Sequence, residues 1–323
     1  MSSYNSTHMM RGTLPLTLLL LVGAGVGATY LFPLSDQPFW AQLYPQVIPN
    51  AIRVGVAILI FCLSCFFGRF LANVFVLYNA PDRRWGTLVA TLLFLLFPDQ
   101  WCSSTAILTL LPYLGSIFYL YQNYRHADRP LALTTIGFFS GLGGLLYPPY
   151  FLLIPIILFT AFDLQTLSLR SLIGFFLGLI SPFVIVSPLV LFAKNIPQIQ
   201  SLLIEEISLR PIWHVAHLPS TPTLVAVCFC IIIYLVGVLV GIVHLSEKKV
   251  QVRQLIAAEM RPLLIIPFGI LYTQHLVGLT LLTLIPCSMT FALAFPAHHR
   301  KLRRFWLVVF AIAILVVWGL LLL

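Results

Sequence analysis

The stretch IGFFSGLGGLLYPPYFLLIPIIL, residues 136–158, decides the fold of this chain. It contains no charged residue, and a Tyr-Pro-Pro-Tyr turn at 147–150 interrupts it. Such an apolar run is typical of a lipid bilayer, where the backbone has no water and must form its hydrogen bonds within a helix. Proline lacks a backbone donor, so the turn divides the run. The sequence therefore predicts two membrane helices, 130–146 and 149–162, joined by a short outer hairpin.

The composition of the whole chain extends this interpretation. Of its 323 residues, 60% are hydrophobic and only 8% are charged, and the mean hydropathy is +1.01. A soluble domain carries roughly 25% charged residues, so we expect an all-α polytopic membrane protein. The formal net charge of +9 fits cytoplasmic loops rich in Lys and Arg. Membrane lipids are therefore the expected partners, and nucleic acid is not.

The cysteines and histidines do not predict a metal site or a cofactor. Cys62 and Cys65 form a CxxC pattern within an apolar run, whereas redox or metal chemistry needs a polar, accessible site. Free cysteine usually behaves as a small buried hydrophobe. His214 and His217, and the pair at 298–299, lack partner ligands at the spacing of a metal site.

About eleven apolar segments are expected to be transmembrane helices, and the chain is read as one transmembrane domain, 1–323. The first is read as an uncleaved signal anchor. The segments span approximately 13–32, 50–78, 85–97, 104–121, 130–146, 149–162, 171–192, 222–245, 262–274, 277–296 and 305–322.

Positive charge predicts how these helices cross the membrane. With the N-terminus inside, alternate loops place 14 of the 18 basic residues at the inner face and only Lys194 and Arg210 in outer loops. Because cytoplasmic loops are enriched in Lys and Arg, this asymmetry predicts an N-in, C-out topology. The other two lie in segment 50–78. Arg53 is near its outer end, and Arg69 is nearer its inner end, where it either snorkels or faces the bundle interior.

Three segments are too short to cross the bilayer. Two of them have 13 residues and one has 14, and 13 residues cover only about 20 Å of a hydrocarbon core about 30 Å thick. Their outer turns should lie below the headgroups, where irregular backbone needs protein or water around it. We expect an outward-facing polar cavity, or alternatively tilted helices in a thinned bilayer with Trp and Tyr at the interface. The candidate cavity walls are Asp99, Trp101, Tyr147, Tyr150, Tyr272, Gln274 and His275.

This arrangement resembles the GT-C superfamily of membrane glycosyltransferases, which use polyprenyl-phosphate-linked sugars. A short third helix ends in Pro98-Asp99, the glycine-rich hairpin at 136–158 follows, and LIGFFLGLISPFVIVSPLVLF (172–192) has a mid-helix proline. An amphipathic outer helix at 196–208, either a passive float or a lid, comes next. The resemblance covers 1–245 and leaves 246–323 as a C-terminal three-helix extension. The chain is also similar to GT-C-like integral membrane proteins of Bacteroidota.

The resemblance implies where catalytic acids would lie. In the superfamily, an acid in the first outer loop is the usual general base or metal ligand, and a second acid follows the third helix. Asp36 and Asp99 match these two positions. Here, however, the first outer loop (33–49) is short and has no paired acids, Tyr147 stands where a lysine is often found, and no large outer sugar-binding domain follows.

Three functions are compatible with these features. The departures favour a non-catalytic protein of cell-envelope assembly in the bacterial inner membrane, which binds a lipid or stabilises a membrane-protein partner. A glycosyltransferase is the alternative, with Asp36 as general base and Asp99 assisting or holding a divalent cation. Arg53, Lys194 or Arg210 would then neutralise a polyprenyl-phosphate donor. A transporter is the third possible function. Many transporters are built from inverted repeats, and the sequence shows none.

Overall fold

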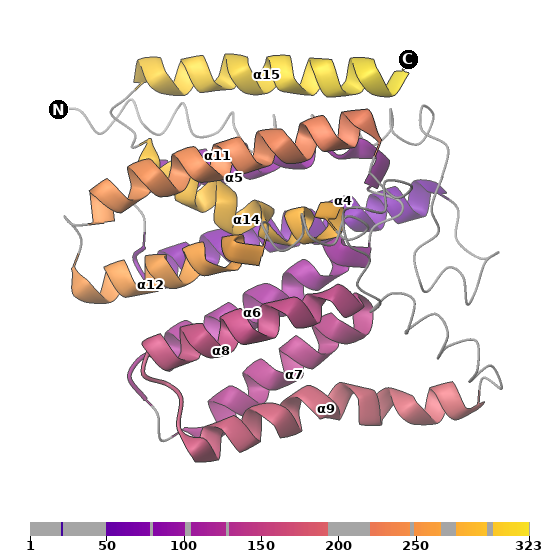
Figure 1. Ribbon diagram of the computed structural model, residues 1–323, viewed down its shortest axis with the longest axis vertical. Coiled ribbons are helices and arrows are strands. Elements are labelled where there is room, and N and C mark those ends of the chain that lie inside the picture. The colour runs from indigo at the N-terminus through magenta and orange to yellow at the C-terminus, as the bar shows by residue number, and fades with distance from the viewer. Residues whose placement is uncertain are drawn as a thin grey trace, which may run out of the picture.

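The structure is a computed structural model that describes residue 21 and residues 50–77, 80–100, 105–126, 129–192, 220–245, 249–265, 276–295 and 300–322. Within these residues it is all-α, with ten α-helices (Figure 1). They are α4 (Asn50–Val74), α5 (Ala80–Phe94), α6 (Leu110–Gln122), α7 (Pro130–Leu146), α8 (Ile154–Asp163), α9 (Leu169–Phe192), α11 (Thr221–Leu245), α12 (Val250–Met260), α14 (Leu276–Ala294) and α15 (Arg300–Leu322). The 3₁₀ helices are η1 (Pro98–Gln100), η2 (Thr105–Thr109), η3 (Pro148–Leu153) and η5 (Arg261–Leu264).

Five of the described helices are long and apolar enough to cross a membrane. The candidate spans are Val54–Val74, Leu169–Pro188, Thr221–Val243, Leu276–Ala294 and Lys301–Leu322. The stretches Ala106–Gln122, Pro130–Leu146 and Pro148–Asp163 are apolar but shorter. The chain is therefore a multi-pass helical membrane protein. Eleven crossings and the N-in, C-out topology stay predictions.

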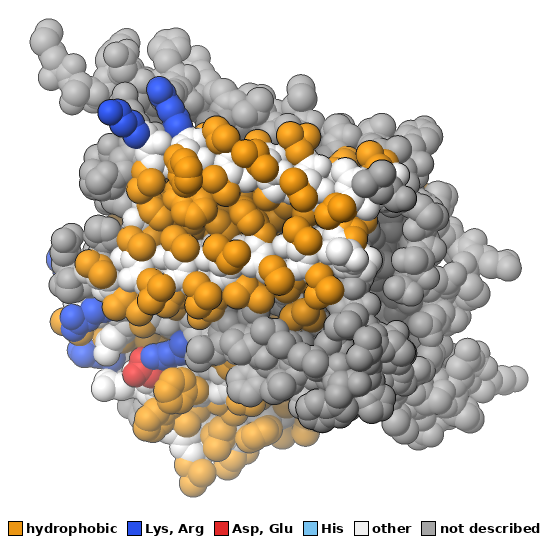
Figure 2. Space-filling view, turned by 45° about the horizontal axis from the view of Figure 1, so that its top comes forward, with side chains coloured by type: hydrophobic (Ala, Val, Ile, Leu, Met, Phe, Trp, Pro, Cys, Tyr) orange, Lys and Arg blue, Asp and Glu red, His pale blue; other side chains and the backbone are white. Residues whose placement is uncertain are grey.

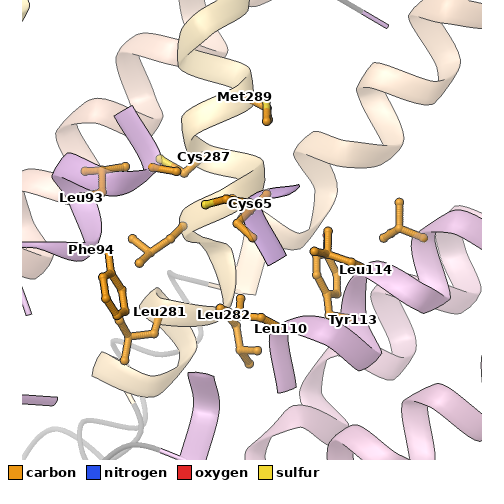
Figure 3. Close-up of a cluster of buried hydrophobic side chains, with 14 of the residues drawn as sticks. Cys65, Leu93, Phe94, Leu110, Tyr113, Leu114, Leu281, Leu282, Cys287 and Met289 are labelled. Carbon is orange, nitrogen blue, oxygen red and sulfur yellow. The ribbon is translucent and has the colours of Figure 1, made fainter. Parts of the chain in front are cut away.

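Helix α14 lies at the centre of the bundle. All of its residues, from Leu276 to Ala294, are buried, as expected for a helix that is apolar on every side. Its neighbours include α5, α11 and α12 (Figure 1). Figure 3 shows the close apolar packing around it, with Leu93, Leu110, Leu282 and Cys287 among the labelled side chains.

The hydroxyl groups of α14 are satisfied within the helix. Thr280, Thr283, Ser288 and Thr290 each donate to a carbonyl three or four residues earlier, at 2.7–2.9 Å. These side chains therefore lie in the core without needing a partner from another helix.

Helices α7 and α9 meet backbone to backbone. Both carry a Gly-x-x-x-Gly pattern, Gly137–Gly141 in α7 and Gly174–Gly178 in α9. A Cβ atom on Gly137 would lie 2.0 Å from the carbonyl oxygen of Phe175, and one on Gly178 would lie 2.0 Å from that of Thr134. Small residues at such spacing let membrane helices approach closely. Gly137 faces Phe175, and Gly141, one turn later in α7, faces Leu179, one turn later in α9. The two helices therefore run parallel. In the sequence, α8 lies between them and connects the end of α7 back to the start of α9.

The basic residues gather at one end of the described helices. At one end of α14, Gly278 meets Tyr147; at the other, Phe295 accepts hydrogen bonds from Arg303. Arg303 contacts Asp82 at the start of α5, and Arg83 contacts Asn73 near the end of α4. Figure 2 shows Lys and Arg side chains along one edge of a broad apolar face. We call the end of the bundle where Arg303 contacts Phe295 and Asp82 the basic end.

Several helix boundaries differ from the expected ones; for example, the expected helix 149–162 consists of η3 followed by α8. The stretch between the expected helices 222–245 and 262–274 was interpreted as an inner loop because it is basic. Residues 250–260 of it form α12, which buries Leu255, Ile256 and Met260 and exposes Arg253. In addition, α5 begins at Ala80 instead of 85, so it has 15 residues. At about 1.5 Å per residue it still falls short of a bilayer core about 30 Å thick.

Candidate functional site

Most of the predicted site residues lie outside the described part of the chain. This applies to Asp36, Trp101, Lys194, Arg210, Gln274 and His275. For Arg53 in α4 and Asp99 in η1, the structure describes the backbone but not the side chain. Convergence of Asp36 and Asp99 in one cavity, which would favour the glycosyltransferase alternative, is therefore not tested by the described side chains. Tyr147 and Tyr150 are the two candidates whose side chains are described.

The tyrosine turn is folded into the bundle. Tyr147 ends α7 in an extended conformation, with its N–H donating to the Gly143 carbonyl at 2.9 Å, and η3 starts at the next residue. The Tyr147 side chain is buried, and its hydroxyl faces Gly278, where a Cβ atom would lie only 2.2 Å away. The Tyr150 ring is fully buried against Gly143, where a Cβ atom would lie 2.8 Å from it. Glycine at 143 and 278 is therefore what lets both rings enter the core.

Two hydroxyl groups in α6 and α7, those of Tyr113 and Ser140, are buried without a hydrogen-bond partner among the described residues. The hydroxyl of Tyr150 in η3 is also buried, and the Ser116 side chain lies beside it. A buried hydroxyl that forms no hydrogen bond destabilises the folded state by about 1–3 kcal/mol. These hydroxyl groups are polar positions in a largely apolar part of the interior.

An ion pair ties α15 to α5 at the basic end. The guanidinium of Arg303 lies 2.7 Å from the Asp82 carboxylate and also donates to the Phe295 carbonyl at 2.9 and 3.1 Å. It lies over the Trp85 ring as well, 5.2 Å from the ring centroid. Both charged side chains are largely buried, so removing one partner would leave the other charge poorly solvated.

A second ion pair ties α8 to η5. Arg261 lies 2.5 Å from Asp163 and stacks over Phe159 at 5.0 Å. Asp163 is the last residue of α8, where a negative charge is unfavourable beside the helix dipole unless a cation compensates it. An acid at the C-terminus of a helix, in a chain with few charged residues, therefore indicates that a basic side chain pairs with it. The sequence analysis did not predict this ion pair of Asp163.

Two tyrosines of the α6 end hold α12 in place. Tyr121 donates to the Leu255 carbonyl at 2.9 Å, and the Tyr124 hydroxyl bonds to the Gln254 amide oxygen. The Arg125 N–H donates to the Leu164 carbonyl at 3.0 Å, so α6 and α8 also end side by side. These contacts join the ends of α6 and α8 and the helix α12 at the basic end.

No group of three or more His, Cys, Asp or Glu side chains that could hold a metal ion occurs in the described residues. Cys62 and Cys65 are free thiols, half-buried and buried respectively. Cys230 and Cys287 are buried, whereas Cys228 is exposed.

Comparison of the chain with family models, curated proteins and solved structures finds no match. Its helical architecture and its five candidate spans are thus the features that classify it. The chain is a multi-pass helical membrane protein, and its location in a membrane implies contact with lipid.

Proposed function

We propose that the chain is a non-catalytic protein of cell-envelope assembly in the bacterial inner membrane. Its GT-C-like bundle binds a lipid, such as a polyprenyl phosphate, alone or within a membrane-protein complex. The sugar-transfer reaction of the superfamily is not part of this function.

The observation that carries the proposal is the packing of the tyrosine turn. Tyr147 and Tyr150 were expected to line an open cavity, but both rings are buried against Gly278 and Gly143. This part of the expected cavity wall therefore stabilises the fold, and a lysine that could contact a donor phosphate is replaced here by a packed tyrosine. The buried hydroxyl groups of Tyr113 in α6 and Ser140 in α7 are polar groups without a hydrogen-bond partner among the described residues.

Two of the described acids, Asp82 and Asp163, support the same conclusion. Asp82 and Asp163 each form an ion pair with an arginine, at 2.7 and 2.5 Å. A general base must reach the acceptor hydroxyl with a free carboxylate, and both of these carboxylates are engaged in joining helices.

One observation favours the glycosyltransferase alternative. The 3₁₀ helix η1, which contains Asp99, follows only a few residues after the short helix α5 ends. This is where the superfamily carries its second acid. In the alternative, Asp36 is the general base and Arg53, Lys194 and Arg210 are the phosphate-binding residues.

The test combines binding and turnover on the purified, detergent-solubilised protein. We expect native mass spectrometry to detect a stable adduct with polyprenyl phosphate and a much weaker one with the uncharged polyprenol. We also expect no release of sugar from a polyprenyl-phosphate-linked donor. Sugar release that disappears in both Asp36→Asn and Asp99→Asn would establish the enzyme instead, and equal retention of the two lipids would contradict lipid recognition.

A further inference from the structure

Helix α4 presents a continuous apolar stripe at the molecular surface. Its members recur at intervals of three and four residues, which places them on one face of the helix. They are Ile52, Val56, Leu59, Leu63, Phe66 and Phe70, and their exposed fractions run from 42 to 70%. We call this set the α4 stripe. Such a surface is stable only against acyl chains or another apolar surface.

The α4 stripe leads directly to a cluster of arginines. Asn73, the next exposed residue along the same face, accepts a hydrogen bond from Arg83 at 2.6 Å. Arg69 lies one helical turn before Asn73, and Arg84 follows Arg83 at the start of α5. We call Arg69, Arg83 and Arg84 the arginine corner.

Arg84 lies within the electrostatic influence of the other two arginines. Its pKa is lowered, first by partial burial and then by the positive charges of Arg69 and Arg83. An arginine is not deprotonated in proteins. The corner is therefore a local concentration of positive charge.

Neither of the ion pairs in the described part of the chain neutralises this corner. Asp82, the adjacent acid, is paired with Arg303 at 2.7 Å, and the other pair joins Arg261 to Asp163. Arginine recognises phosphate through a fork of N–H donors, and cationic side chains at a membrane surface attract anionic headgroups. The charge that complements the corner is thus an anion from outside the described residues.

We propose that the α4 stripe and the arginine corner form a binding site for one anionic phospholipid of the leaflet at the basic end. Its phosphate contacts Arg69, Arg83 and Arg84, and its acyl chains lie along Phe70 and Phe66. The site is at the opposite end of the helices from the Tyr147–Tyr150 turn. It therefore does not rest on the proposed function.

The test measures lipid binding to the full-length protein in detergent by native mass spectrometry. Phosphatidylglycerol and phosphatidylcholine with the same acyl chains are titrated against the wild type and the double variant Arg69→Gln/Arg84→Gln. Each arginine near a membrane surface strengthens binding to anionic lipid about fivefold, so the double variant should bind phosphatidylglycerol roughly thirtyfold more weakly. Phosphatidylcholine binding should not change.

Two variants and one competitor control this measurement. Arg253→Gln/Lys301→Gln removes the same charge from exposed residues near the same end and should bind phosphatidylglycerol like the wild type. Arg69→Lys/Arg84→Lys keeps the charge and should retain most of the preference. Soluble glycerol phosphate should not displace the lipid, because the α4 stripe contributes to binding.

Three results would overturn the proposal. An equal loss in the Arg253/Lys301 control would mean that overall charge, and not the corner, attracts the lipid. Equal binding of phosphatidylcholine by the wild type would exclude headgroup recognition. Displacement by glycerol phosphate would assign the corner to a soluble anion. Should the Gln double variant not survive solubilisation, Arg84→Gln alone should weaken binding about fivefold, and an unchanged affinity would also contradict the site.

Discussion

Replacing Gly178 with alanine tests one of the two tightest glycine contacts between the described helices. The new Cβ atom would lie 2.0 Å from the Thr134 carbonyl oxygen and 2.9 Å from the Phe138 nitrogen, both of which are backbone atoms. A backbone atom cannot rotate away as a flexible side chain would. The change is therefore expected to separate α7 from α9.

The size of the effect follows from this distance. Ordinary van der Waals contact begins near 3.4 Å, so the helices must separate by about 1.4 Å, and the equally close contact at Gly137 loosens with them. Overpacking in a well-packed interior typically destabilises by about 1–3 kcal/mol. Because the clash is with backbone, we expect a loss of about 3 kcal/mol in the free energy of unfolding, at the upper end of that range.

The assay is equilibrium unfolding by sodium dodecyl sulfate in mixed micelles, followed by circular dichroism. The matched control is Gly55→Ala in α4, where a new Cβ atom meets nothing within 4 Å. This control should be neutral or stabilising by up to about 1 kcal/mol, because alanine restricts the unfolded chain. If the two variants unfold within about 0.5 kcal/mol of each other, α7 and α9 do not meet at their glycines and the deduction fails.

Three further predictions follow from single contacts. Arg303→Gln should lower the unfolding free energy by about 3 kcal/mol, because it leaves the largely buried Asp82 carboxylate unpaired; adding Asp82→Asn should restore part of the loss in the same assay, and no coupling between the two changes would mean that the pair does not form. Tyr121→Phe removes the hydroxyl that bonds Leu255 at 2.9 Å and should cost about 1 kcal/mol. It should also raise hydrogen exchange across 250–260, and unchanged exchange there would show that α12 is held in another way. Finally, in a background without the exposed Cys228, Lys249→Cys should react with an impermeant thiol reagent only from the cytoplasm and Ser220→Cys only from outside; reversed labelling would overturn the predicted topology.

The helical membrane class was predictable because it depends on bulk properties. The chain has 60% hydrophobic residues. In lipid, the α-helix is the main structure in which such a chain can form all of its backbone hydrogen bonds. The positions of α7 and α9 were also predictable from the sequence, because a long apolar run follows Arg129 and another follows Arg170. The close approach of the two helices, however, depends on which glycine faces which carbonyl, and this is a property of the pair.

The ends of the helices were harder to predict. Residues 250–260 were interpreted as part of an inner loop because the stretch is basic. The packing of Leu255 and Ile256 against the bundle and the hydrogen bonds from Tyr121 and Tyr124 stabilise them as α12. Tyr147 and Tyr150 were placed correctly at a turn, but their burial depends on Gly143 and Gly278, and Gly278 is distant in the sequence. Contacts of this kind come from tertiary structure, which hydrophobic periodicity does not encode.

The most direct test of the account is an electron cryomicroscopy structure of the full-length protein in lipid nanodiscs that contain polyprenyl phosphate. The distance between the Asp36 and Asp99 carboxylates and the position of any lipid density are the quantities to measure. The non-catalytic account predicts carboxylates more than about 15 Å apart, too far to serve one substrate, together with density for a bound lipid. Two carboxylates that converge on the phosphate of that lipid would contradict it and would establish the catalytic alternative.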